Sequence, residues 1–538
     1  MAEQNLKDLY FLEGIQYVPK LLELADRNRL NSTYGCFDRG FWHYRTIDFP
    51  SGMYQESVLP LALAFTLKHP SNPYYQNQRI REIVLAGIDY AQRSAYSDGS
   101  CDDYFPFERA AGATAFSLYA CTEALLVLGE KGTERHEFLK LRANYLTEEG
   151  MRESGVLSNH KALIVLGLYN TFLLTQDASF RDKAAACLKK LLDLQTDEGW
   201  FPEYEGCDPG YLTFTIDFLA KYYQKSSDPS VVEPLRKAIG FASYLMHPDG
   251  SFGGEYGSRN TFHFVPHGFE IMAALEPRAI SLTNAFLRSL RQKTRSYLED
   301  DRIFIHYTYN YLQSYKDFFE RKESQNENTP SVFQKFFEKA GFLVVSTPQD
   351  YAVIGIRKGG TAKIFKKTVL KYSDSGLLGT TVCGKRFTSQ VISNWNYTIE
   401  KDLLVIEGNS CVYKPLLFHP LSFLCFRAFV LFVARFFSPN FIRKFLQTKA
   451  ITKKERKLPV RVRKEIPLKT LDRIRYQISL EDPALKIKDL WISSDATFIY
   501  VATSQPFQGA NLLPWIDLNA VLPELNAKRS ISYEYRIA

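Results

Sequence analysis

The sequence predicts an α+β protein with more than one domain, in which an α-helical region comes first and an antiparallel β domain follows. Three observations support this. Up to about residue 320, amphipathic stretches alternate with loops rich in Gly, Asp and Pro. A loop pattern recurs between several of these stretches. Beyond about residue 330, short runs rich in β-branched and aromatic residues replace the helical pattern.

The predicted helices carry apolar residues at helical spacing, and Ala, Gly and Ser recur among them, as close helix packing requires. The clearest predicted helices are 59–68, 79–93, 112–128, 160–174, 180–194, 212–224, 231–245 and 269–275.

The recurring loop joins an Asp/Gly turn to an aromatic residue and then to a carboxylate. It begins at Asp98, at Asp197 and at Asp249, and each copy lies between predicted helices. Repetition of this kind is typical of repeat architectures. If the helical hairpins form a ring, we expect the three loops to emerge on one face.

The predicted strands are short and are separated in part by glycine-containing turns. They are 341–347, 351–357, 361–365, 380–383, 402–408 and 497–503. Residues 322–330 (KESQNENTP) are the best linker candidate. We therefore predict a helical domain over 1–325 and a β domain over 326–538.

An apolar and then basic insert interrupts the β domain over 416–469. Residues 416–437 contain only two charged side chains, and eleven cations against two acids follow. The cations are Arg443, Lys444, Lys449, Lys453, Lys454, Arg456, Lys457, Arg461, Arg463, Lys464 and Lys469. One interpretation is an interfacial helix on an anionic membrane surface. The other is a buried helix followed by a solvated basic loop.

Composition narrows the function classes. The net charge of +8 is concentrated in this insert, so it does not indicate a nucleic-acid-binding protein. Eight scattered cysteines and an N-terminal segment without a secretory pattern predict a cytoplasmic chain, peripheral at the inner membrane face. Aromatic residues make up 14%, which fits either carbohydrate platforms or large aromatic cores.

The densest group of candidate site residues lies in 197–211 (DEGWFPEYEGCDPGY). Tyr204 and Tyr211 are candidate catalytic residues there, and Trp200 and Glu205 are candidate substrate-binding residues. Asp208 is expected to cap the next helix, with a proline at its first position.

A second group lies in 255–270. Arg259 and His263 are candidate catalytic residues, and Glu255, Tyr256 and His267 are candidate substrate-binding residues. The histidine pair has helical metal spacing, but a proline lies between its members, so we predict no metal.

Two further segments complete the candidates. Asn159 and His160 follow Ser158 at a predicted helix start, where either Ser158 or Asn159 could instead be the N-cap. Trp42 and Asp102 are candidate substrate-binding residues in earlier loops.

Familiar nucleotide and hydrolase motifs are missing. The sequence has no GxGxxG after a strand, no GxxxxGK[ST], no GxSxG and no HExxH. We therefore predict no cofactor.

The helical hairpins, the aromatic and acidic loops, the Ser-Asn-His helix start and the C-terminal β domain together resemble the heparinase II/III-like polysaccharide lyases. The resemblance implies an (α/α) toroid followed by an antiparallel β-sandwich-like domain, and activity on an acidic polysaccharide. It also implies that Asn159 and His160 match the family's Asn-His element, with Tyr204 or Tyr211 as its tyrosine. The insert and the lack of a secretory pattern depart from the family, and both point to polysaccharide biosynthesis or modification.

Three functions remain open at this stage. A β-eliminating lyase needs a neutraliser (Asn159 or Arg259), a base (His160, His263 or Tyr211) and an acid (Tyr204 or Tyr211). A glycoside hydrolase would use a carboxylate pair drawn from Glu205, Glu255 and Asp102, and an epimerase would share the proton abstraction of the lyase. The third function is a non-catalytic, membrane-associated factor that binds or assembles glycans.

Overall fold

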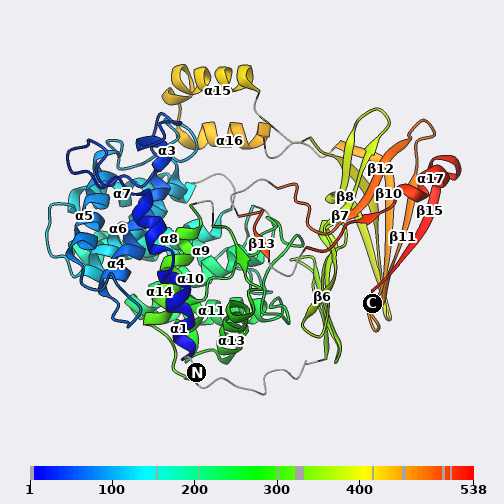
Figure 1. Cartoon of the computed structure of the whole chain (residues 1–538), viewed down its shortest axis with the longest axis horizontal. Helices are drawn as coiled ribbons and strands as arrows, with labels where there is room; N and C mark the ends of the chain where they lie inside the picture. Colours follow the sequence, from blue (N-terminus) through cyan, green and yellow to red (C-terminus); the bar gives the residue numbers. More distant parts are fainter. Residues whose placement is uncertain are drawn as a thin grey trace.

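The protein has a helical N-terminal part and antiparallel β-sheets in its C-terminal part, as predicted (Figure 1). The computed structural model describes residues 5–152, 156–204, 206–299, 302–321, 332–414, 417, 419–450, 456–499, 503–508 and 512–537. The predicted linker, 322–330, lies outside these ranges.

The helices form a closed toroid. Its inner ring runs α4, α6, α8, α10, α12 and α14, in which each helix contacts the next and α14 returns to α4. The outer helices α5, α7, α9, α11 and α13 each pack on an inner neighbour, and α1 packs on α14. The helices are α1 (Leu6–Ile15), α2 (Val18–Leu24), α3 (Arg39–Trp42), α4 (Val58–Thr66), α5 (Gln78–Arg93), α6 (Ala111–Leu128), α7 (His136–Glu148), α8 (Ser158–Thr175), α9 (Ala178–Leu192), α10 (Pro209–Ser226), α11 (Val232–Ser243), α12 (His267–Met272), α13 (Pro277–Gln292) and α14 (Phe304–Lys316).

Helix α6 shows why the inner helices are apolar on all sides. All of its residues from Ala111 to Leu125 are buried, because other inner helices cover both its flanks. Among the described residues it is the one helix that is long and apolar enough to cross a membrane, and 78% of that stretch is buried inside the protein. Its composition is that of a core helix.

The three predicted Asp/Gly loops share one backbone turn. In each, the glycine N–H donates to the carbonyl three residues earlier, as in Gly99 to Tyr96, Gly199 to Thr196 and Gly250 to His247. Each glycine has a positive φ and lies against a following outer helix. At Gly199 a Cβ would lie 2.5 Å from the carbonyl oxygen of Lys237 in α11. The turn therefore requires glycine for both its conformation and its packing.

Two antiparallel sheets form the C-terminal part. The five-stranded sheet has the order β2-β3-β4-β5-β6, and the eight-stranded sheet has the order β14-β12-β7-β8-β9-β10-β11-β15. The strands are β2 (Phe333–Phe337), β3 (Phe342–Ser346), β4 (Asp350–Gly355), β5 (Thr361–Lys366), β6 (Val369–Asp374), β7 (Gly376–Thr381), β8 (Arg386–Glu400), β9 (Leu403–Val412), β10 (Arg456–Pro467), β11 (Arg473–Leu480), β12 (Ile487–Ser493), β14 (Ile516–Asp517) and β15 (Ser530–Arg536).

The five-stranded sheet is the middle layer of the molecule. In β3, Phe342 and Val344 belong to the core shared with the helices, whereas Leu343 and Val345 belong to the core shared with the eight-stranded sheet. Successive side chains of a strand point to opposite faces, so both faces of this sheet are covered. That explains the continuous apolar run of β3, which lacks the alternation of a half-exposed strand.

Two expectations for the C-terminal part are wrong. Residues 497–499 form no strand, and residues 500–502 lie outside the described ranges. Instead, the Thr497 hydroxyl accepts a hydrogen bond from Asn260, and Phe498 packs against Tyr413.

The insert is also not one helix followed by a loop. The apolar run breaks after Phe432 into α15 (Pro420–Phe432), the short helix η5 (Ala434–Phe436) and α16 (Pro439–Ala450). The later cations belong to strand β10. Lys464 is fully buried there and ion-paired with Asp374, and Arg461 and Arg463 pair with acids on the same or neighbouring strands. Lys453 and Lys454 lie outside the described ranges.

Candidate functional site

The N-terminal end of α8 is held by a carboxylate from the next loop. The backbone N–H and the side-chain amide of Asn159 both donate to Oε1 of Glu203, at 2.8 and 2.9 Å. The Ser158 hydroxyl donates to the carbonyl of Pro202. Leu157 is the N-cap, so neither Ser158 nor Asn159 caps the helix with its side chain. A carboxylate at this position satisfies a free helix N–H and faces the positive end of the helix dipole.

Glu203 is buried, and its carboxyl group loses its proton at a higher pH than that of an ordinary glutamate. Burial raises its pKa to about 7, against the opposing hydrogen bonds from Asn159 and the charge of His160. Its second oxygen, Oε2, has no hydrogen-bond partner among the described residues. Near neutral pH, Glu203 can therefore gain or lose a proton, although both of its oxygens lie inside the protein.

Tyr204 follows Glu203 and stacks on Arg259. The guanidinium carbon of Arg259 lies 3.5 Å from the centroid of the Tyr204 ring. Burial raises the pKa of Tyr204 to about 12, while Arg259 acts to lower it. Burial also lowers the pKa of Arg259, and its Nε has no hydrogen-bond partner among the described residues. Both side chains are partly exposed, so a ligand can reach them.

Asp208 joins the two predicted loops. It caps α10 by accepting from the Tyr211 N–H at 3.1 Å, as predicted, with Pro209 at the first helical position. Its other oxygen accepts from the N–H of Arg259 at 2.8 Å. This buried carboxylate therefore fixes Arg259 and Tyr211 relative to one another.

Tyr211 and His263 form the inner side of the site. Their ring centroids are 5.4 Å apart in an edge-to-face arrangement. The Tyr211 hydroxyl accepts a hydrogen bond from Thr503 at 2.9 Å, so a segment from the far end of the chain contributes to the site. Burial, together with nearby His306, lowers the pKa of His263 to about 3. His263 is therefore neutral at physiological pH and a weak proton acceptor.

His160 follows Asn159 on α8 and is partly exposed. Its ring lies edge-on to Phe116, and it approaches α6 so closely that a Cβ on Gly112 would lie 2.7 Å from its Cε1. Burial lowers its pKa, and the charge of Glu203 partly offsets this. A neutral, accessible imidazole next to a carboxyl group is suited to proton abstraction.

His306 and Glu56 form a buried histidine–carboxylate pair inside the toroid. Nδ1 of His306 is 3.0 Å from the buried Glu56, and its ring contacts both Phe116 and Phe214. Phe116 also contacts His160, and Phe214 also contacts His263. The His306–Glu56 pair is therefore linked to His160 through the ring of Phe116 and to His263 through the ring of Phe214.

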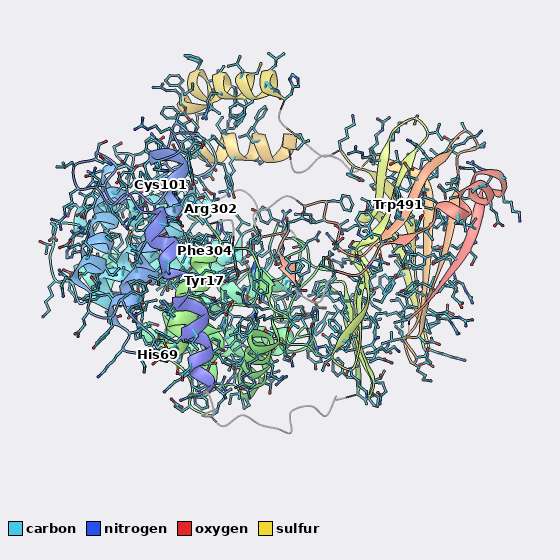
Figure 2. The ribbon with its side chains drawn as sticks, viewed as in Figure 1. Tyr17, His69, Cys101, Arg302, Phe304 and Trp491 are labelled. Atoms are coloured by element: carbon cyan, nitrogen blue, oxygen red, sulfur yellow. The ribbon has the colours of Figure 1, made fainter. Side chains whose placement is uncertain are left out.

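The first repeated loop also reaches this region. Arg302 pairs with Asp103 at 2.9 Å and lies over the ring of Tyr104. Charge on Asp103 raises the pKa of His160, and Tyr104 has the same influence on Tyr204. Figure 2 shows Arg302 in the helical part, towards the side from which α15 and α16 project.

All six predicted catalytic residues lie in one connected group. We call this group, with Glu203 added, the site cluster: Asn159, His160, Glu203, Tyr204, Tyr211, Arg259 and His263. Their roles in catalysis stay predictions. No group of three or more His, Cys, Asp or Glu side chains that could hold a metal ion occurs within the described ranges.

Most of the predicted substrate-binding residues have internal partners instead. Asp102 accepts from the Tyr96 hydroxyl and from two N–H groups of its own loop. Glu255 pairs with the buried Lys363 at 3.2 Å, and Trp200 donates to Glu198. These contacts give the three side chains roles in holding loops.

Three of the remaining candidates also have internal partners. Tyr256 is buried and hydrogen-bonds His247, and His267 is buried against Asp317 at 2.9 Å. Trp42 donates to the carbonyl of Leu24, next to a separate hollow lined by residues of 30–47. Glu205 lies outside the described residues.

Sequence reasoning missed three contributors, namely Glu203 as a titrating group, Thr503 and the His306–Glu56 pair. Glu203 stands two residues before the chosen Glu205, and the sequence alone does not distinguish the two. Thr503 is 292 positions from its partner. No local pattern indicates such a contact.

Comparison with protein-family models finds no match, and comparison with curated proteins finds none. Among solved structures, the chain is similar to the chondroitin AC lyase of Streptomyces coelicolor A3, determined in complex with chondroitin sulphate. The TM-score is 0.51 at 10% identity, over 91% of this chain and 72% of that chain. This protein thus has the toroid-plus-β-sheet fold of a polysaccharide lyase, as the resemblance implied.

Two other solved structures show weaker likeness. A heparan sulfate lyase from Pedobacter heparinus has a TM-score of 0.35 at 10% identity, covering 84% of this chain and 74% of that chain. An unsaturated glucuronyl hydrolase from Streptococcus agalactiae has a TM-score of 0.38 at 10% identity, covering 58% of this chain and 90% of that chain.

Proposed function

We propose that this protein is a polysaccharide lyase that cleaves an acidic polysaccharide by β-elimination. The observation that carries the proposal is the stacking of Tyr204 on Arg259 next to the Asn159–Glu203 pair and His160. The fold, shared with a chondroitin AC lyase, supports the same reaction class. The acidic polysaccharide is the proposed partner.

The first requirement of this reaction is neutralisation of the uronate carboxylate, because its charge otherwise suppresses removal of the α-proton. Arg259 is the neutraliser best placed for this, since its side chain is partly exposed and carries a positive charge. Asn159 is buried and engaged with Glu203, so it acts by positioning that carboxyl group. Glu203 itself is fully buried, so it acts on the site through Asn159 and through the loop that carries Tyr204.

The second requirement is a base and an acid. His160 is neutral and partly exposed, and therefore suits removal of the proton from the carbon next to the carboxylate. His263 suits this role poorly because its pKa is about 3. Tyr204, with a pKa of about 12, keeps its proton and can give it to the leaving glycosidic oxygen. The C–O bond then breaks as the C=C bond forms.

Hydrolysis has less support than elimination. Of its three candidate carboxylates, Asp102 and Glu255 have internal partners, and Glu205 lies outside the described residues. Epimerisation remains the second candidate, because it uses the same proton abstraction and returns the proton without breaking the glycosidic bond. A glycan-binding factor without catalysis is the third.

We further propose that the enzyme works in polysaccharide biosynthesis or modification, in the cytoplasm at the inner membrane face. All eight cysteines are free thiols, and two of them, Cys383 and Cys425, are exposed, which fits a reducing compartment. The exposed apolar hairpin formed by α15 and α16, treated in the next subsection, fits the membrane location.

Mass spectrometry of the products separates the candidates. The full chain is incubated in D₂O with a panel of chondroitin, heparan and uronate polymers. Elimination yields fragments that are lighter by one water than hydrolytic fragments. Epimerisation yields uncut chains that carry deuterium. Hydrolytic fragments, deuterated uncut chains, or unchanged polymers throughout the panel would each contradict the lyase proposal.

A further inference from the structure

The insert folds into a helical hairpin that projects from the helical part of the molecule, clear of both sheets (Figure 1). We call α15, η5 and α16 the apolar hairpin. It touches the toroid through a few contacts, among them Arg427 with Asp48 at 2.8 Å and Asn440 with Glu149 at 2.7 Å. Phe426 packs edge-to-face on Phe105.

The apolar hairpin, together with Leu417 shortly before it, carries a large share of the exposed apolar side chains. Among the described residues, 23 large hydrophobic side chains are exposed, and ten of them lie between 417 and 445. These ten are Leu417, Leu421, Phe423, Leu424, Phe432, Val433, Phe436, Phe437, Phe441 and Phe445. A concentration of this kind marks an interaction surface, because single exposed apolar residues are ordinary but a continuous group is not.

The pattern of α15 fits a lipid environment. It is apolar around its whole circumference, with Arg427 as its single charged residue, yet Val430 is its only buried residue. Such helices are normally covered by protein or by lipid. Its 13 residues span about 20 Å, which is short of the roughly 30 Å of a bilayer core. The helix can therefore lie in the interface and cannot cross it.

The charge of this segment distinguishes between two possible occupants of the exposed surface, an anionic bilayer and a second copy of the chain. Residues 408–454 contain no Asp or Glu and eight cations. Of these, Arg435 and Lys444 are exposed on the hairpin, and Lys414 is exposed just before it. In a symmetric dimer the same patch meets itself, so these cations would face one another. An anionic lipid surface instead complements both the cations and the apolar side chains.

We propose that the apolar hairpin docks this protein peripherally on an anionic lipid bilayer, with α15 lying in the membrane interface. The binding is mainly apolar and has a moderate electrostatic part, because the cations of β10 pair with acids of the sheets.

Docking would also place the site next to the bilayer. The loop that touches the hairpin, through Phe105 with Phe426 and Phe107 with Arg435, is the first repeated loop of the toroid. Two residues earlier, Asp103 pairs with Arg302 beside the site cluster. A polymer that is attached to the membrane, or that grows there, would therefore reach the site without first leaving the membrane.

The test is flotation of the full chain with phosphatidylcholine vesicles, with and without phosphatidylglycerol, at low and high salt. We expect binding to the anionic vesicles that salt weakens. Two independent double variants, Leu421→Ser/Leu424→Ser and Phe432→Ser/Phe436→Ser, should each weaken binding roughly tenfold or more. The matched control, Leu30→Ser/Leu512→Ser, removes apolar side chains that are 93% and 74% exposed elsewhere, and should bind like the wild type.

Two outcomes would overturn the proposal. One is wild-type chain that floats with neither vesicle type. The other is equal weakening of binding by the control and the hairpin variants. Sedimentation velocity tests the alternative occupant. A concentration-dependent dimer that the hairpin variants abolish, together with no flotation, would assign the hairpin to a second copy of the chain.

Discussion

The amide group of Asn159 and the carboxylate of Glu203 are joined twice through one oxygen, since both the backbone N–H and Nδ2 of Asn159 donate to Oε1. This double contact leaves Oε2 of Glu203 without a hydrogen-bond partner among the described residues. It ties the start of an inner helix to the loop that carries Tyr204.

The pKa of Glu203 predicts a pH-dependent stability. Its pKa is about 7 in the folded protein, against 4.5 for an ordinary glutamate. Between these values the folded state keeps a proton that the unfolded chain has released, so stability falls as pH rises from about 4.5 to 7. Glu203→Gln removes this term, which amounts to about 3 kcal/mol at most. Denaturant unfolding at pH 5 and pH 8 should show a smaller pH dependence in the variant than in the wild type.

Glu137→Gln, at a glutamate that is 86% exposed, serves as the control and should leave the pH dependence unchanged. Equal pH dependence in Glu203→Gln and the wild type would mean that Glu203 ionises normally.

Gly112→Ala should impair catalysis without removing any functional group. The added Cβ would lie 2.7 Å from Cε1 of His160 and would push the ring away from its position. Displacement of a general base by about 1 Å can cost on the order of 10²-fold in rate. Gly167→Ala, on α8 and facing Leu118 at 3.2 Å, is the control, and steady-state kinetics should show little change for it. Wild-type rates in Gly112→Ala would remove His160 from the mechanism.

Arg259 is expected to act on the charge of the substrate carboxylate. Arg259→Lys keeps the charge but loses the planar stacking on Tyr204, and should lower kcat/KM by about tenfold or more on an acidic polymer. On a methyl-esterified polymer, which has no carboxylate charge to neutralise, the same variant should lose much less. Equal losses on both polymers would show that Arg259 only holds Tyr204 in place.

Lys464 is expected to stabilise the β domain and to take no part in lipid binding. Its ammonium group is buried 2.6 Å from Asp374, so Lys464→Met should cost about 3–5 kcal/mol by leaving that carboxylate unpaired. Lys469→Met, at a side chain that is 75% exposed, should cost about 0–1 kcal/mol. Denaturant unfolding gives both values, and flotation should show unchanged vesicle binding for Lys469→Met. Equal stability losses would contradict the assignment.

Much of the helical part was predictable because its signals are local. The apolar periodicity located α4, α5, α6, α8, α9, α10 and α11 to within a few residues but missed α7. The Asp/Gly turns identified the repeat, since glycine is required at each turn. Strands β3, β4 and β5 were found for the same reason. Strand β10 was missed because its cations resemble a solvated loop, and only the acids of neighbouring strands reveal their role.

The candidate site was predictable in part. Asn159 stands at a predicted helix start, and Tyr204 and Arg259 stand in loops rich in aromatic and charged residues, so the sequence already indicates all three. The role of Glu203, and the internal partners of Asp102, Glu255 and His267, depend on burial and on contacts between distant segments. A single sequence carries no local signal for either.

The most direct test of the central claim is the ultraviolet absorbance of the unsaturated uronate that β-elimination forms. The wild-type chain, mixed with an acidic polysaccharide that it degrades, should give a steady rise in this absorbance. His160→Ala and Tyr204→Phe should each slow the rise on the order of 10²-fold or more, whereas Tyr397→Phe, at a tyrosine that is 42% exposed on β8, should leave it unchanged. Depolymerisation without this absorbance, or wild-type rates in both site variants, would contradict the account.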